Sequence, residues 1–88
     1  MTMINQRDHY TAWALLLVQL DDARKHLENL INEMHASGAI DDEQFVVDLG
    51  HVFAHLNRAW HSRNQEGEIS EAQWAEFSSF PEDLKPVG

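Results

Sequence analysis

Apolar side chains recur at steps of three and four residues along two long stretches of this chain. In the first, about residues 5–36, no proline or glycine interrupts the run, and the spacing predicts one helix with a continuous apolar stripe. Asn5 is the expected N-cap, and Gly38 is the expected left-handed residue that ends the helix. The stripe consists of Tyr10, Trp13, Leu16, Leu17, Leu20, Ala23, Leu27, Leu30, Ile31 and Met34.

The second stretch, about residues 41–64, predicts another amphipathic helix. Asp41 is the expected N-cap, and Gln44 stands where a capping box requires it. Ile40 is expected to pack on Phe45. Because the link between the two predicted helices is short, they are expected to lie antiparallel as a hairpin. The predicted inward face consists of Phe45, Val46, Leu49, Val52, Phe53, Leu56, Ala59 and Trp60.

A third helix start follows at Ser70, with Gln73 three residues later. This pattern predicts a short helix over about residues 70–79, and the tail, residues 80–88, is expected to be irregular. Residues 1–88 are therefore predicted to form a single all-α domain. Its architecture is a long antiparallel helical hairpin plus a short third C-terminal helix.

One segment of the first predicted helix is apolar on every side. Residues 12–18 read AWALLLV, and Leu15 and Val18 point away from the main stripe. Something besides the second helix is expected to cover them: the aromatic residues near the third helix, or a second copy of the chain. A dimeric helical bundle is favoured, because a lone hairpin buries little apolar surface to offset the conformational entropy of folding.

Composition narrows the class of protein. The 88 residues include no cysteine, which excludes disulfides and thiolate metal sites and favours a cytoplasmic protein. No apolar run approaches the roughly 20 residues that span a bilayer, so no membrane association is expected. The net charge is −9, and residues 64–88 carry six acidic residues against one base, Lys85. This balance disfavours nucleic-acid binding through a basic patch and permits a basic protein partner.

The histidines are candidate metal ligands. Asp48, His51 and His55 follow one another at steps of three and four, so they share one edge of the second predicted helix. Such an edge can hold a divalent metal if a further ligand comes from elsewhere. His26 and Asp22 are expected to project away from the apolar stripe of the first helix. The alternative is a solvated polar edge beside the core.

The sequence contains no motif of an enzyme. It lacks a glycine-rich phosphate loop and a nucleophile elbow, so neither catalysis nor a cofactor is predicted. Aromatic residues are frequent in protein interfaces, and the candidate interface residues are Tyr10, Trp13, Leu15, Val18, Trp60, Trp74, Phe77 and Phe80. A second candidate surface is the strip of Gly50, Ala54, Asn57 and His61 on the back of the second helix.

The leading functional hypothesis is a small acidic, non-enzymatic protein–protein interaction module, such as an inhibitor, immunity-type or adaptor protein. It would present a helical surface to its partner. The alternatives are a metal-binding helical bundle that uses the histidine edge, and a purely structural homodimer.

Overall fold

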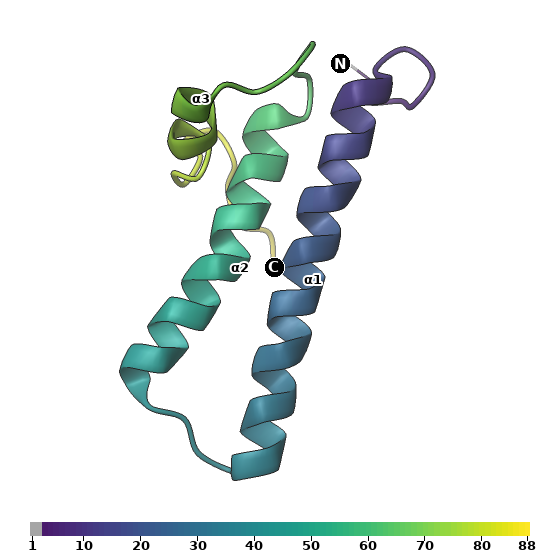
Figure 1. The fold of residues 1–88 in the computed structure, drawn as a ribbon. Coiled ribbons are helices and arrows are strands. Elements are labelled where there is room, and N and C mark those ends of the chain that lie inside the picture. Colours follow the sequence, from purple (N-terminus) through teal and green to yellow (C-terminus); the bar gives the residue numbers. More distant parts are fainter. Residues whose placement is uncertain (1–2) are drawn as a thin grey trace.

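A computed structural model describes residues 3–88 and contains three helices over that range (Figure 1). α1 spans Tyr10–Ser37, α2 spans Asp42–Ser62 and α3 spans Glu71–Glu76. α1 and α2 lie side by side as an antiparallel hairpin, and α3 lies on the side of α2 that faces away from α1. The described residues contain no strand. The predicted all-α class and helical hairpin are therefore confirmed.

α1 begins later than the sequence pattern predicted. Asn5 does act as a cap, but of a separate turn: its side-chain oxygen accepts a hydrogen bond from the Asp8 amide at 2.7 Å. Its carbonyl accepts from the amide of His9 at 3.1 Å. His9 then leaves helical geometry, with φ −134° and ψ 55°, so the continuous helix starts only at Tyr10.

The hairpin turn follows the predicted capping in part. Gly38 has a φ of 68°, and its amide donates to the carbonyl of Met34 at 2.9 Å, as expected of a helix-ending glycine. Asp41 caps α2 by accepting from the Glu43 amide at 3.4 Å. The predicted capping box is not formed, because the side chain of Gln44 donates to Asp48 at 2.8 Å instead.

α3 has the capping box that the sequence predicted. The Ser70 hydroxyl accepts from the Gln73 amide, and the Gln73 side chain accepts from the Ser70 amide, both at 3.1 Å. The helix is shorter than predicted. The hydroxyls of Ser78 and Ser79 donate to the carbonyls of Ala75 and Glu76, and these bonds satisfy the last helical carbonyls without another turn.

The hydrophobic core of the hairpin is small. The fully buried hydrophobic residues are Ala12, Ala23, Leu30, Val52 and Ala59, so only two of them are larger than alanine. Gln19, Asn57 and Ser62 are also buried. Half of the residues predicted to face inward on the two helices are instead exposed, from 39% for Phe53 and Leu56 to 69% for Tyr10. The two helices therefore meet along a narrow seam.

This seam lies at one edge of the apolar stripe of α1. The buried residues Ala12, Gln19, Ala23 and Leu30 form one ridge, whereas Leu20, Leu27 and Ile31 lie roughly 80° further around the helix at about 100° per residue. α2 packs on the first ridge and leaves the second one exposed.

No helix among residues 3–88 has the length and apolar character that crossing a membrane requires.

Candidate functional site

One side of the hairpin carries a continuous band of apolar side chains, here called the apolar face. Its α1 residues repeat at steps of four, seven, four and three, which places them on one side of that helix. Its α2 residues repeat at steps of three and four. The face consists of Leu16, Leu20, Leu27, Ile31 and Met34 of α1 with Phe53, Leu56 and Trp60 of α2.

The C-terminal tail lies over the half of the apolar face nearest the chain termini. Leu84 lines a groove of about 360 Å³ together with Leu16, Leu20 and Leu56, and the tail passes behind α2 in Figure 1. The indole N–H of Trp60 donates to the Asp83 carboxylate at 2.9 Å. This hydrogen bond lowers the pKa of Asp83 below its ordinary value, so the tail is held by both apolar and polar contacts.

The half of the apolar face nearest the hairpin turn is open. Leu27, Ile31 and Met34 are between 41% and 46% exposed, and Ile31 and Met34 line a groove of about 340 Å³ together with His35. Single exposed apolar residues are common, but a contiguous band of them marks an interaction surface.

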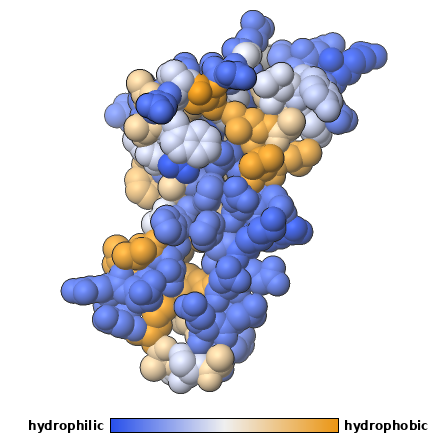
Figure 2. All heavy atoms as spheres, viewed as in Figure 1, coloured by the Kyte–Doolittle hydropathy of each residue, from blue (hydrophilic) through white to orange (hydrophobic). Residues whose placement is uncertain are grey.

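The opposite side of the hairpin carries three histidines, here called the histidine cluster. The ring centroid of His26 lies 5.1 Å from those of both His51 and His55. The sequence interpretation placed His26 away from the hairpin contact, and this is corrected by the structure. The reason is the rotation of α1: His26 is seven residues after the buried Gln19, so it continues the seam. Figure 2 shows the polar band that crosses the hairpin at mid-height.

His55 connects the histidine cluster to the core. Its Nδ1 lies 2.8 Å from the side-chain oxygen of Gln19, which is 1% exposed. Burial lowers the pKa of His55, and the neighbouring His26 and His51 act in the same direction, while Asp22 opposes them. Neutral His55 can therefore donate to the buried Gln19 oxygen and satisfy it.

The predicted metal ligands are divided in the structure. His51 and His55 both face His26, while Asp48 accepts a hydrogen bond from Gln44. Within residues 3–88, no group of three or more histidine, aspartate or glutamate side chains is arranged to hold a metal ion. The His26 ring packs against those of both His51 and His55.

The predicted interface residues are distributed over several surfaces. Leu15 and Trp74 line one small hollow with Ile69, and Arg58 lies over the Trp74 ring at 4.3 Å. Tyr10 and Val18 are 69% and 54% exposed, so the third helix does not cover Val18. Of the others, Trp13 is partly buried in α1, Phe77 stacks on His61, Phe80 contacts Phe53, and Trp60 lies beneath Arg63.

The strip on the back of α2 is partly covered. Asn57 is buried and donates to the Ser78 carbonyl at 2.7 Å. A ring nitrogen of His61 lies 3.0 Å from the Ser79 carbonyl. The predicted flat strip is therefore corrected at these two positions: it is the docking surface for the segment after α3. Gly50 remains open, since a Cβ there would meet no atom within 4 Å.

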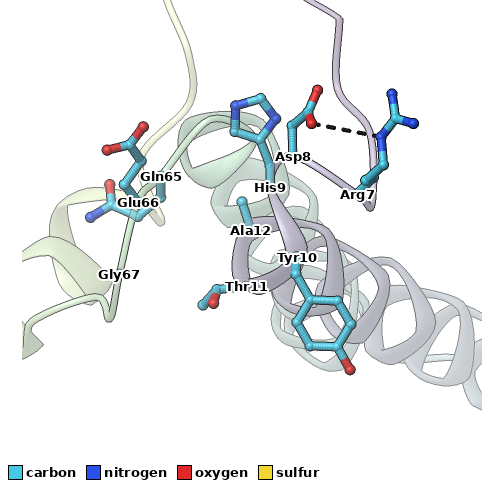
Figure 3. Close-up of a pocket in the computed structure, with 9 residues that line it drawn as sticks. All are labelled: Arg7, Asp8, His9, Tyr10, Thr11, Ala12, Gln65, Glu66 and Gly67. Carbon is cyan, nitrogen blue, oxygen red and sulfur yellow. Dashed lines mark ion pairs between the residues drawn. The ribbon is translucent and has the colours of Figure 1, made fainter.

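A further hollow lies between the N-terminal turn and the loop after α2 (Figure 3). It has a volume of about 250 Å³ and places His9 between the Arg7–Asp8 pair and residues 65–66. The Nε of Arg7 lies 3.8 Å from Asp8, and both side chains are well exposed. Exposed pairs of this kind contribute little free energy, so the hollow has no rigid polar anchor.

The fold and these surfaces define a small helical-hairpin protein with one apolar and one histidine-bearing side. The chain matches no protein-family model, no curated protein and no solved structure.

Proposed function

We propose that this chain is a small acidic, non-enzymatic protein–protein interaction module that presents the apolar face to a protein partner. The supporting observation is the pairing of a very small core with a large exposed apolar band. Burying apolar surface is the main favourable term in both folding and association. A chain that leaves Leu27, Ile31 and Phe53 exposed gains most by covering them.

The chemistry of the apolar face favours a protein as its ligand. The grooves along it are open rather than enclosed, and their linings are mostly aliphatic and aromatic. A small molecule would be left largely in water there, whereas sites for small molecules enclose most of their ligand. A helix or a pair of helices, by contrast, can lie along the band and insert apolar side chains into it.

A capture experiment tests this function. The immobilised wild-type chain, an Ile31→Glu variant and a Val18→Glu variant are each exposed to native extract and to a differently tagged copy of the chain. The proposal expects partners bound by the wild type and by Val18→Glu but lost from Ile31→Glu. Val18 is the matched control, because it is a similarly exposed apolar residue of α1 on another side of the helix. Partners captured equally by all three proteins would contradict the proposal.

A second candidate function uses the acidic C-terminal part of the chain. Residues 64–88 carry six acidic residues and one base, a balance that would attract a basic protein surface. Charge reversal of Glu66, Glu68 and Glu71 would then abolish capture, while Ile31→Glu would leave it intact. This pattern is the opposite of the one expected for the apolar face.

Metal binding is a third candidate, favoured by the approach of His26 to His51 and His55. A metal would require these rings to turn toward a common point, and His55 would give up its contact with Gln19. Metal analysis of the untagged chain and titration with Zn²⁺ or Ni²⁺ test it. If the chain binds metal there, His51→Gln and His55→Gln should each reduce the metal affinity by at least about tenfold. A metal-free chain that responds to neither ion would exclude this function.

A further inference from the structure

We infer that the partner on the apolar face is a second copy of this chain, which seats its own apolar face there to form an antiparallel four-helix bundle. The inference rests on the proposed function and names its partner. It depends on three features: the surface area of the single chain, the distribution of its charges and the symmetry of the hairpin.

The single chain exposes more surface than a folded monomer of its size. A monomer of 10.1 kDa is expected to expose about 5,300 Å², whereas this chain exposes 6799 Å². Its radius of gyration is 14.9 Å, against about 12 Å for a compact 88-residue domain. The excess surface is about 1,500 Å², and a standard interface removes about 800 Å² from each partner.

A second copy of the chain is the partner that accounts best for this excess of exposed surface. Because the core contains only Leu30 and Val52 as large buried hydrophobic residues, the hairpin depends on cover for much of its stability. A partner that stabilises the fold by covering the apolar face has to be present whenever the chain folds, at a concentration equal to that of the chain. A second copy meets this condition, and obligate homodimers commonly lack a stable folded monomer for the same reason.

The charges of the chain favour such pairing along the grooves of the apolar face. Each copy has a net charge of −9, so two copies repel each other wherever acidic groups meet. The three grooves along the apolar face are lined by no acidic residue, and their only ionisable lining residues are His35, Arg63 and Lys85. Arg24, beside the face, is paired with Asp21. The Asp83 carboxylate is bonded to Trp60 of this face, but the groove linings themselves offer no acidic group to a strongly basic partner.

The hairpin also has the symmetry that self-pairing needs. α1 and α2 are antiparallel, so a two-fold axis that lies in the plane between two apolar faces leaves every helix antiparallel to its neighbours. Two hairpins then meet through identical patches, as in an isologous dimer. Leu20, Leu27, Ile31 and Met34 are spaced at seven, four and three residues, which is the spacing that interlocks side chains in a four-helix bundle.

Sedimentation equilibrium of the untagged chain tests the inference with Leu27→Glu and Val18→Glu as matched variants. Residues 18 and 27 are nine positions apart, about two and a half turns, so they lie on opposite sides of α1. The wild type and Val18→Glu are expected at twice the 10.1 kDa chain mass. Leu27→Glu should raise the dimer dissociation constant by at least about a hundredfold, because each copy would bury an unpaired charge.

A second measurement covers the case in which Leu27→Glu fails to fold. The chain has no cysteine, so Leu27→Cys and Val18→Cys can each carry one nitroxide spin label. The inference expects a shorter distance between labels across the dimer at position 27 than at position 18. The reverse order, or a dimer that Leu27→Glu leaves unchanged, would place the contact elsewhere and overturn the inference.

Binding of an apolar fluorescent dye separates this inference from the proposed function. A wild-type monomer that binds the dye, and loses it in Leu27→Glu, would overturn the homodimer while supporting a different protein partner on the apolar face. A stable wild-type monomer that binds no dye would overturn both, since the face would then be neither exposed nor paired.

Discussion

The two sides of the hairpin are built from the same two helices, but their side chains differ in how many contacts they make within the chain. On the histidine side, His26 packs on His51 and His55, and His55 reaches the buried oxygen of Gln19. On the apolar side, Leu27 and Ile31 find no such neighbours and remain 41% and 46% exposed. Within one chain, the rings of the histidine side pack across the hairpin, whereas these apolar side chains stay exposed.

This difference indicates what each side contributes. A buried polar contact such as Gln19–His55 has strict geometric requirements, so it fixes how α1 and α2 are aligned more than it adds stability. An apolar face is tolerant of geometry and supplies free energy in proportion to the area it buries. We therefore assign the alignment of the hairpin to the histidine side, and the apolar side is the surface proposed for association.

The largest effect on stability is expected at the buried seam where α1 and α2 meet, between the two sides of the hairpin. Leu30→Ala removes a side chain that is 3% exposed and leaves a cavity in an already small core, so it should cost about 2–5 kcal/mol of the free energy of unfolding. Urea denaturation at fixed chain concentration measures it. Val18→Ala is the control, with an expected change within about 0.5 kcal/mol. Equal costs for both would mean that the seam is not the core.

The next effect concerns the alignment of the helices. His55→Leu leaves the buried Gln19 oxygen without a partner and should cost about 1–3 kcal/mol. Gln19→Leu should cost less, since the partly exposed His55 can turn to water. The double variant should resemble Gln19→Leu alone. Additive losses in urea denaturation would show that the two side chains do not act as a pair.

A smaller effect is expected from pH, and its sign follows from the lowered pKa of His55. The groups around His55 are Gln19, Asp22 and His26 from α1 and His51 and Arg58 from α2. Because the folded chain binds the proton less readily than the unfolded chain, stability is complete above the ordinary value of 6.5. It then falls as the pH drops from there toward the lowered pKa.

The measurement for this prediction is the urea midpoint at pH 7 and pH 5 for the wild type and for His55→Gln. The wild type should lose more than the variant, which has no titrating ring at position 55. An equal loss in both proteins would assign the pH dependence to other groups.

The smallest effect concerns the tail on the apolar side. Asp83→Ala removes the acceptor for the Trp60 indole, and this exposed contact should hardly change the stability of the hairpin. It should instead speed amide hydrogen exchange in residues 82–88 and alter the Trp60 environment. Slow exchange of the tail in the variant would show that Leu84, rather than Asp83, holds it.

Local rules predicted the helices well but not the way in which they meet. Gly38 and the Ser70–Gln73 capping box depend on neighbouring residues only, and both formed as predicted. The predicted start at Asn5 failed because Asn5 capped a separate turn. These outcomes depend on hydrogen bonds within a few residues, which a sequence pattern can represent.

The rotation of α1 is what the sequence pattern could not give. The apolar stripe is wider than one helix contact, so its midpoint indicated Leu20 and Leu27, whereas α2 packs on the ridge of Gln19 and Ala23. Ala12, Gln19 and His26 follow one another at seven-residue steps, and this spacing could have indicated the ridge that α2 contacts. Because Gln19 and His26 are polar, the hydrophobic pattern did not include them. A stripe wider than one helix contact fits α2 at more than one rotation of α1, so the pattern alone does not say which part of the stripe α2 covers.

Hydroxyl-radical footprinting of the wild-type chain at micromolar concentration tests the contrast between the two sides most directly. Leu27, Met34 and Phe53 should be labelled far less than their single-chain exposure of 39–42% implies, and labelling should rise in Leu27→Glu at the remaining two positions. His51, on the other side, should be labelled alike in both proteins. Full labelling of Met34 and Phe53 in the wild type would contradict the account, because the apolar face would then be uncovered in the native protein.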